Sequence, residues 1–207
     1  MNRNERRAWK QALTLAELGE LTACWLEGDI ASQPGYKPNC GPARETIELI
    51  PTLAKLNRAG YVTVGSQPGL PPTEGYDGRI WSQRAAVSGF ADDATWDRIR
   101  IAVERTRQLV LIAHHTPPRW QWRLPSSGMA VTAAGHGHRV STEFGGRMSL
   151  GDLEGCFAEL GRGGFATVRD AHQVTVIDPV WGRAEYLWSV LDAAVADVVQ
   201  ALSLIHI

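Results

Sequence analysis

The stretch that decides the fold reads Leu56-Asn57-Arg58-Ala59-Gly60-Tyr61-Val62-Thr63-Val64-Gly65-Ser66-Gln67-Pro68-Gly69. Gly60 predicts the end of a helix, because glycine adopts the left-handed conformation of a C′ residue without strain. The apolar run Tyr61–Val64 then predicts a short buried strand. Small polar residues follow and open a long loop, rich in glycine and proline, over 66–78. Strand ends of this kind commonly border ligand sites, although a plain turn capped by Ser66 would explain the same residues.

The segment before this strand predicts two helices. Thr14 and Glu17 form a capping-box pattern, and apolar residues at helical spacing continue that helix to Gly28. A loop rich in proline and glycine, residues 33–41, separates the first helix from the second. Pro51 in the second helix either kinks it or is the first residue of its second half.

The rest of the chain intermixes helices and strands. We predict, in order, a helix over 83–90, a helix opened by Asp92 and Asp93, a strand over 109–113, a hairpin of strands 129–132 and 139–142, a short helix capped over 149–152, a strand over 174–177 and a closing helix over 186–202. This order indicates an α+β (mixed α/β) fold, with helices packed on a mixed β-sheet core. The length of 207 residues fits a single domain over residues 1–203.

Composition limits the classes of partner. The 21 basic and 22 acidic residues leave a formal net charge of −1, so we expect no nucleic-acid partner. No apolar stretch reaches the roughly 20 residues that cross a bilayer, so we expect no membrane partner. The charged first ten residues and three widely spaced cysteines indicate the reducing cytoplasm. Residues 204–207, Leu-Ile-His-Ile, break the pattern of the closing helix, and we interpret them as a non-native tail.

The sequence lacks the common catalytic fingerprints. It has no dinucleotide-binding glycine pattern, no Walker A loop, no zinc-protease helix motif and no nucleophile elbow. A Ser66 nucleophile would need a base, and His114 is the candidate for that base. The missing motifs argue against an NTPase, a dinucleotide oxidoreductase, a zinc protease and an α/β-hydrolase, and no motif assigns a catalytic residue. A hydrolase or transferase that uses His114 and Ser66 remains the alternative.

Two other groups of residues could carry chemistry. His136 and His138 lie in a glycine-rich turn, where an H-x-H pair on one strand face could hold zinc with a third ligand. No carboxylate stands nearby at a recognisable spacing, so we expect no metal and keep this pair as an alternative. Trp120 and Trp122 alternate with polar residues in a loop that could cover a core edge, or bind a protein partner or a second copy of the chain.

Several segments, in the same order along the chain, resemble the C-terminal regulatory domain of eukaryotic methylenetetrahydrofolate reductase. That family has an E-T pair, a helix and then V-N-R-x-G-I-L-T-I-N-S-Q-P, to which Glu45-Thr46 and residues 56–68 are similar. Its F-Q-K-A-Y-L-E-F-F and P-T-V-V-D-P-V elements resemble residues 82–90 and 174–180. The chain as a whole resembles an uncharacterised actinobacterial domain family that shares its SQ-G and D-P-x-W-G-R elements.

The resemblance implies the fold of that regulatory domain, which binds S-adenosylmethionine as an inhibitor and performs no catalysis itself. Carried over residue by residue, its ligand contacts fall on Glu45, Thr46, Thr63, Ser66 and Thr175. Gly65 stands where the family has asparagine, so one amide contact is missing. We add Gln67 and Asp178 as further ligand-binding candidates, although Asp178 before Pro179 would equally hold a turn.

The expected function is therefore a stand-alone small-molecule-binding domain of the sensor or regulatory type. The expected ligand is S-adenosylmethionine or S-adenosylhomocysteine, or a related nucleoside or amino-acid metabolite. A catalytic barrel of eight βα units does not fit beside this domain in 207 residues, so the sequence excludes the reductase activity itself.

Overall fold

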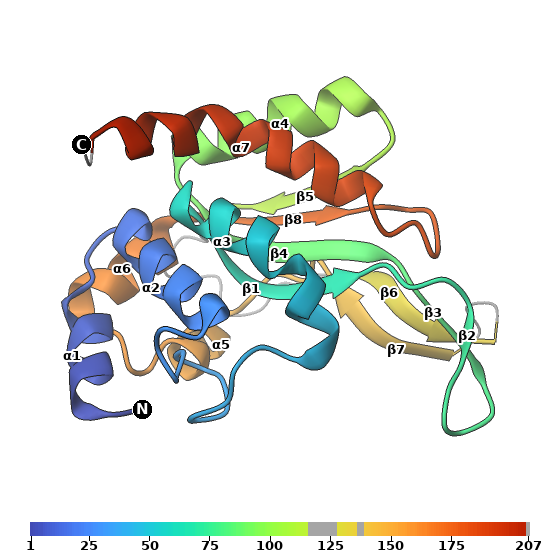
Figure 1. Ribbon diagram of the computed structural model, residues 1–207, viewed down its shortest axis with the longest axis horizontal. Coiled ribbons are helices and arrows are strands. Elements are labelled where there is room, and N and C mark those ends of the chain that lie inside the picture. The colour runs from blue at the N-terminus through green and yellow to red at the C-terminus, as the bar shows by residue number, and fades with distance from the viewer. Residues whose placement is uncertain (116–127, 136–138, 206–207) are drawn as a thin grey trace.

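The computed structural model describes residues 1–115, 128–135 and 139–205 (Figure 1). Within these residues the chain forms an α+β fold of seven α-helices, one 3₁₀ helix and two four-stranded sheets. The predicted fold class is confirmed. The expectation of a mixed sheet needs one correction, because every strand pairing in the described residues is antiparallel.

A continuous segment of chain joins the two sheets. The first sheet has the strand order β1 (Tyr61–Pro68), β4 (Ala85–Ala91), β8 (His172–Ile177) and β5 (Val110–His114). The second has the order β2 (Thr73–Glu74), β3 (Ile80–Gln83), β6 (Met129–Ala134) and β7 (Arg139–Phe144). Only Arg84 separates β3 from β4, so the chain passes directly from one sheet into the other.

Helices cover the first sheet. They are α1 (Arg3–Gln11), α2 (Leu15–Glu27), the 3₁₀ helix η1 (Arg44–Leu49), α3 (Ile50–Arg58), α4 (Asp93–Thr106), α5 (Leu150–Cys156), α6 (Arg162–Asp170) and α7 (Tyr186–Ile205). Figure 1 shows α3, α4 and α7 beside the first sheet, while α1, α2, α5 and α6 gather at the end where the N-terminus lies. No helix in the described part of the chain combines the length and the apolar character needed to cross a membrane.

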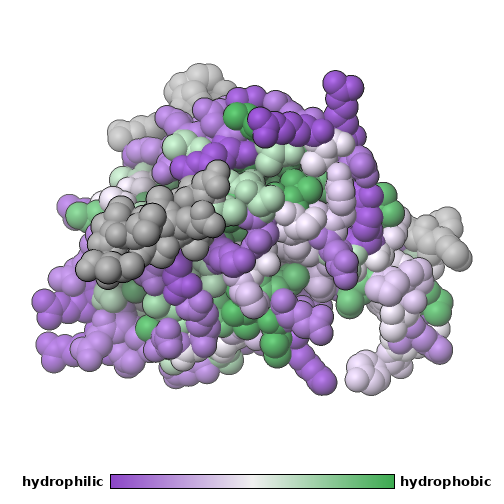
Figure 2. Space-filling view, turned by 45° about the horizontal axis from the view of Figure 1, so that its top comes forward, coloured by the Kyte–Doolittle hydropathy of each residue, from purple (hydrophilic) through white to green (hydrophobic). Residues whose placement is uncertain are grey.

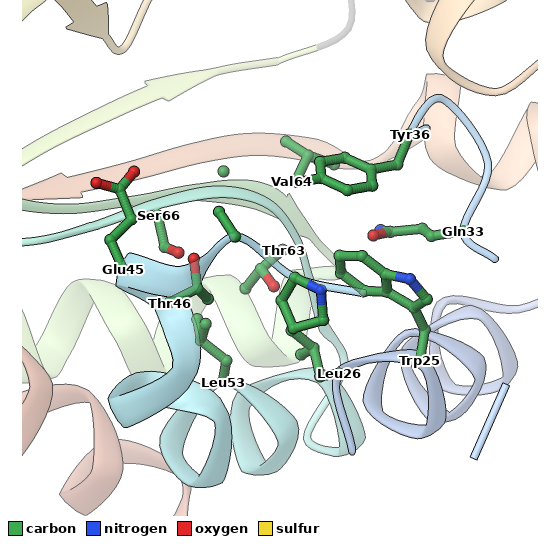
Figure 3. Close-up of a pocket in the computed structure, with 13 residues that line it drawn as sticks. Trp25, Leu26, Gln33, Tyr36, Glu45, Thr46, Leu53, Thr63, Val64 and Ser66 are labelled. Atoms are coloured by element: carbon green, nitrogen blue, oxygen red, sulfur yellow. The ribbon is translucent and has the colours of Figure 1, made fainter. Parts of the chain in front are cut away.

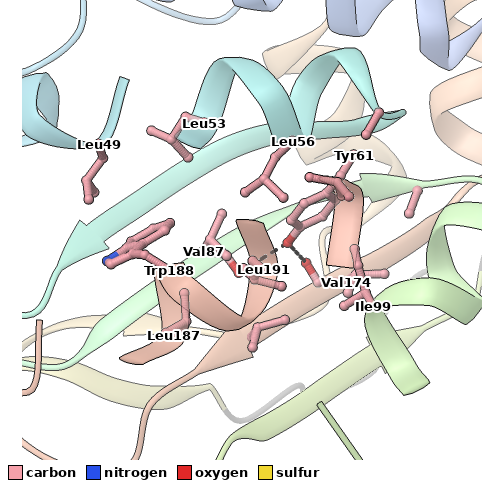
Figure 4. Packing of buried hydrophobic residues seen from close by; sticks show 14 of the residues in the cluster. Leu49, Leu53, Leu56, Tyr61, Val87, Ile99, Val174, Leu187, Trp188 and Leu191 are labelled. Carbon is pink, nitrogen blue, oxygen red and sulfur yellow. Dashed lines mark hydrogen bonds between the residues drawn. The ribbon is translucent and has the colours of Figure 1, made fainter. Parts of the chain in front are cut away.

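The main core lies between the first sheet and helices α3, α4 and α7 (Figure 4). Tyr61 at the start of β1 is fully buried in it, and burial raises the pKa of its phenol far above the ordinary value. The Tyr61 hydroxyl donates a hydrogen bond to the carbonyl oxygen of Val174 at 2.8 Å and also lies 3.2 Å from that of Val87. Its polar atom is therefore satisfied inside an apolar core.

One asparagine joins helix α3 to strand β1. The Asn57 side chain is completely buried; its Nδ2 donates to the Leu53 carbonyl and to the Thr63 hydroxyl, each at 2.8 Å. Its Oδ1 accepts a hydrogen bond from the Thr63 backbone N–H at 2.9 Å. On its other side, α2 crosses so closely that a Cβ atom on Gly19 would lie 2.0 Å from the Asn57 carbonyl oxygen. Asn57 therefore fixes the relative positions of α2, α3 and β1.

The predicted helix boundaries are confirmed in the first third of the chain. Thr14 caps α2 in a capping box with Glu17, and Gly28 ends the helix in the left-handed conformation. Pro51 lies in the first turn of α3, directly after η1, so it starts the second half of the helical segment and does not kink it. Gly60 has a positive φ of 92° at the junction with β1.

Two predictions about this part of the sheet were wrong. Residues 83–90, expected to be helical, form the end of β3 and most of β4. Ala85, Ala86 and Val87 are each fully buried, because β4 lies inside the sheet and is covered on both faces. A doubly buried strand shows no alternation of polar and apolar residues, so its pattern does not distinguish it from a helix. The loop expected from residue 66 begins later, since β1 continues to Pro68.

Downstream elements agree better with prediction. The expected strand over 109–113 corresponds to β5, the two hairpin strands to β6 and β7, and the expected strand over 174–177 to β8. Ser149 caps α5 in a capping box with Asp152. Helices α1 and α6 were not predicted. Figure 2 shows hydrophilic and hydrophobic side chains interspersed on one face of the molecule.

We predict that Asn57→Ala lowers the free energy of unfolding by about 2–4 kcal/mol. The substitution leaves the Thr63 N–H and hydroxyl buried without the side-chain partner and removes an additional bond to the Leu53 carbonyl; each unpaired buried group costs about 1–3 kcal/mol. Urea denaturation monitored by circular dichroism measures the change. Asn4→Ala, on the exposed surface of α1, is the control and should change stability by less than about 0.5 kcal/mol. Equal stability of the two variants would contradict the role assigned to Asn57.

Candidate functional site

A cavity of about 170 Å³ lies beside the edge strand β1, between η1 and the end of α2 (Figure 3). It is lined by Trp25, Leu26, Gln33, Tyr36, Pro42, Ala43, Glu45, Thr46, Leu53, Thr63, Val64, Gly65 and Ser66. These residues come from the end of α2, the segment that follows it, η1, α3 and β1. The cavity therefore joins parts of the chain that are well separated in sequence.

The polar side of this cavity contains four of the predicted ligand-binding residues, Glu45, Thr46, Thr63 and Ser66. Thr63 pairs with Gly89 and Gly65 pairs with Ser88, so Val64 is the extra residue of a β-bulge. The bulge changes the alternation of β1 and returns Ser66 to the face that Thr63 occupies. Glu45 and Thr46 approach this face from η1 (Figure 3).

The aromatic side of the cavity is formed by Trp25 and Tyr36. Their ring centroids lie 5.2 Å apart with an angle of 64° between the ring planes, an edge-to-face arrangement. The Trp25 indole N–H donates to the carbonyl oxygen of Cys40 at 3.0 Å, which ties the segment after α2 to the helix itself. This side offers a ring surface against which a flat apolar group can pack.

The polar groups of the cavity have complementary hydrogen-bonding capacity. The Thr63 hydroxyl accepts from Asn57, so its own proton is available for another acceptor. Glu45 is exposed, and its Oε2 lies 3.4 Å from Nε2 of Gln83. A carboxylate attracts a ligand ammonium group, while the hydroxyls of Thr46 and Ser66 can donate or accept.

The cavity is smaller than a complete metabolite site. Pockets for small molecules usually measure roughly 300–1,000 Å³. A more open hollow adjoins the cavity and shares Glu45 with it; Arg44, Ile47, Glu48, Pro68 and Leu70 also line this hollow. A nucleoside-sized ligand would therefore have to extend past Glu45.

Three predicted ligand-binding residues, Gln67, Thr175 and Asp178, lie outside the cavity. Gln67 is opposite Ala86, which packs between the two sheets, so the Gln67 side chain is on the other face of β1 from Ser66. Thr175 on β8 shares a 2.8 Å hydrogen bond with the hydroxyl of Ser88. Thr175 and Ser88 both line a separate small cavity of about 30 Å³, which His114 also lines. The structure does not bring Gln67 or Thr175 together with Glu45 and Ser66 in one pocket.

Gly65 has a packing role that accounts for the missing asparagine. A Cβ atom at this position would lie 3.0 Å from the Cε1 atom of the Phe144 ring on β7. That distance is shorter than ordinary van der Waals contact, so the ring occupies the space where the resembling family carries a side chain. The amide contact of that family has no counterpart at this position.

Asp178 holds a turn and lies outside the residues that line the candidate cavity. Its carboxylate is fully buried, accepts a hydrogen bond from the Val180 N–H at 2.9 Å and pairs with both Nε and Nη2 of Arg183. The ion pair raises the pKa of Arg183, which stays charged. The structure therefore favours the interpretation of Asp178-Pro179 as a turn.

Ser66 and His114 do not form a catalytic pair. Ser66 lies on β1 and His114 on β5, which are the two opposite edges of the first sheet. Three strand spacings of about 4.8 Å separate the edges, or roughly 14 Å, whereas proton transfer needs contact near 3 Å. His114 Nε2 instead lies 2.8 Å from the carbonyl oxygen of Gly145. The strand order therefore corrects the expectation that Ser66 and His114 act as a nucleophile and its base.

The remaining predicted groups fall on residues that the structure does not describe. His136 and His138 lie between β6 and β7, and Trp120 and Trp122 lie between β5 and β6, outside the described ranges. Among the residues that are described, no group of three or more histidine, cysteine, aspartate or glutamate side chains is arranged to hold a metal ion.

Sequence reasoning missed the aromatic side of the cavity. In the sequence, Trp25 falls within the predicted helix that ends at Gly28, and Tyr36 within the predicted loop over 33–41. The signal that could have indicated them is weak: Trp25 lies near the Gly28 cap, and a buried tryptophan usually places its indole N–H against a hydrogen-bond acceptor.

The fold and this cavity define the chain as an α+β domain with a small polar and aromatic pocket at the edge of an antiparallel sheet. Residues 4–198 match the family described as a domain of unknown function, DUF6919, and the chain therefore belongs to that family. A search of curated proteins found no match.

We predict that Asp178→Asn lowers the free energy of unfolding by about 2–4 kcal/mol. The change leaves the Arg183 guanidinium without its buried carboxylate partner. Asp192→Asn removes an exposed pair with Lys55 and serves as the control, with an expected cost below about 1 kcal/mol. Thermal denaturation of both variants checks this, and a stability loss for Asp192→Asn as large as for Asp178→Asn would contradict it.

Proposed function

We propose that this chain is a small-molecule-binding domain whose ligand is S-adenosylmethionine, S-adenosylhomocysteine or a related nucleoside or amino-acid metabolite. The observation that carries the proposal is the convergence of Glu45, Thr46, Thr63 and Ser66 on one cavity. The same four residues match the ligand contacts of the methylenetetrahydrofolate reductase regulatory domain. Agreement between the sequence resemblance and the geometry supports a ligand of the same chemical class.

The chemistry of the cavity walls fits such a ligand. Glu45 supplies a negative charge for an ammonium group, and the hydroxyls of Thr46, Thr63 and Ser66 suit the hydroxyl groups of a ribose. The rings of Trp25 and Tyr36 suit a purine, because aromatic rings pack edge to face or offset. Few precisely placed polar groups in an apolar surround are the usual composition of a metabolite site.

The proposed role is that of a sensor or regulatory domain that binds its ligand without transforming it. The proposed location is the cytoplasm, which is consistent with three free cysteines. A protein partner or a second copy of the chain, docked through the Trp120 and Trp122 loop, would receive the binding signal.

We predict that isothermal titration calorimetry detects binding of S-adenosylmethionine or S-adenosylhomocysteine to the full chain. Glu45→Gln should weaken S-adenosylmethionine at least tenfold, because a hydrogen bond to a charged group contributes about 1.5–3 kcal/mol. Ser66→Ala should weaken it about threefold to tenfold, since a neutral hydrogen bond contributes about 0.5–1.5 kcal/mol.

The matched control is Glu104→Gln on α4, an exposed glutamate paired with Arg100 and remote from the cavity lining. It should bind like the unaltered chain. Absence of heat with both ligands, at protein concentrations near 100 μM, would remove the basis of the proposed function; affinities of the Glu45 and Ser66 variants equal to that of Glu104→Gln would place the ligand elsewhere.

A further inference from the structure

The open hollow that adjoins the candidate cavity lies where the far end of a ligand would extend. It measures about 660 Å³, and Glu45 lines both the hollow and the cavity. Figure 3 shows Glu45 at the end of the cavity away from Trp25 and Tyr36. A ligand whose purine packs against the two rings would therefore direct its other end past Glu45. The chemistry of the hollow then determines which group that end carries.

The 3₁₀ helix η1 arranges the charged side chains of the hollow in two rows. Residues three apart lie directly above one another in such a helix. Glu45 and Glu48 therefore form one row, and Arg44 and Ile47 form the row beside it. All four side chains are exposed and line the hollow. One wall of the hollow thus presents a guanidinium group next to two carboxylates.

Hydrogen bonds hold the other part of the lining in place. The Pro68 carbonyl oxygen accepts a hydrogen bond from the Trp188 indole N–H at 3.3 Å, and the Leu70 carbonyl oxygen accepts one from the Gln83 backbone N–H at 3.0 Å. The side chain of Gln83 also lies 3.4 Å, from Nε2 to Oε2, from Glu45. Walls that are already fixed lose less conformational freedom when a ligand binds.

Apolar side chains lie in water beside these charges. Ile47 is 55% exposed and Leu70 is 43% exposed, and both line the hollow. A short aliphatic chain packed against them would remove apolar surface from water, which is favourable. The methylene groups between the sulfur and the α-carbon of S-adenosylmethionine form a chain of this kind.

We propose that the hollow is a subsite for a free α-amino acid group, with the carboxylate on Arg44 and the ammonium group on Glu45 and Glu48. The N–H donors of a guanidinium group form a fork that matches the two oxygens of a carboxylate, and the glutamate carboxylates accept from the ammonium group. This amino-acid subsite rests on the proposed function. It narrows the ligand class to metabolites with an unmodified amino-acid end, and it makes Arg44 a specificity-determining residue.

The test uses two ligands that differ by one carboxylate, S-adenosylmethionine and decarboxylated S-adenosylmethionine. Isothermal titration calorimetry measures both affinities for the full chain and for Arg44→Met, which keeps a long side chain and removes the charge. Arg44→Met should lower the affinity for S-adenosylmethionine about fivefold. The affinity for the decarboxylated ligand should stay the same or rise, because Arg44 repels a ligand that carries only positive charges.

Two further variants sharpen the test. Arg44→Glu should lower the ratio of the two affinities further than Arg44→Met, because it places a third carboxylate beside the ligand carboxylate. Arg105→Met, which removes an exposed arginine of α4 outside the lining of both the cavity and the hollow, is the matched control. It should bind both ligands like the unaltered chain.

The outcomes separate the amino-acid subsite from the proposed function. An unchanged ratio of the two affinities in Arg44→Met and Arg44→Glu overturns the subsite and leaves the proposed function standing. Equal weakening of both ligands also overturns it, because the effect then does not depend on the ligand carboxylate. Failure of the unaltered chain to bind S-adenosylmethionine and S-adenosylhomocysteine overturns the proposed function and the subsite with it.

A folding measurement accompanies the binding data. Arg44 is exposed, so both substitutions should leave the melting temperature within about 2 °C of that of the unaltered chain. A markedly lower melting temperature of Arg44→Met would show that the guanidinium group has a structural role, which overturns its assignment to the ligand.

Discussion

The rest of the structure depends on the hydrogen bonds of the Asn57 side chain. Its amide forms three hydrogen bonds that join the end of α3 to the start of β1. Its backbone carbonyl also lies so close to Gly19 of α2 that no side chain fits between them. Because the same amide holds the Thr63 backbone and hydroxyl, the position of the candidate site follows directly from the junction that organises the fold.

The bulge at Val64 determines which residues of β1 share the cavity. Without the extra residue, strict alternation would place Thr63 and Ser66 on opposite faces. With it, both hydroxyls line the cavity, and Gln67 turns toward the second sheet with Ala86. One irregularity in a single edge strand thus supplies polar groups to both sides of that strand.

Much of this fold could be predicted from local signals. The caps at Thr14 and Gly28, the first-turn proline Pro51 and the glycine at residue 60 are visible in the sequence, because each satisfies a requirement of one helix end alone. Strand β4 could not be recognised, since its burial depends on neighbours far away in sequence. For the site, four of the five residues expected from the family resemblance line the cavity, and Thr175 does not. The bulge that excludes Gln67 and the aromatic wall depend on tertiary contacts that no local pattern encodes.

Helix α2 connects a close contact with the core to the wall of the cavity. Gly19 touches the Asn57 backbone, and Trp25 follows six residues later, about 9 Å along the same helix. The Trp25 wall is therefore anchored to the core, whereas the facing wall, residues 33–43, belongs to no helix or strand. Changes in that segment would accordingly reshape one wall of the cavity, while the Trp25 wall stays fixed by the contact of Gly19 with the core.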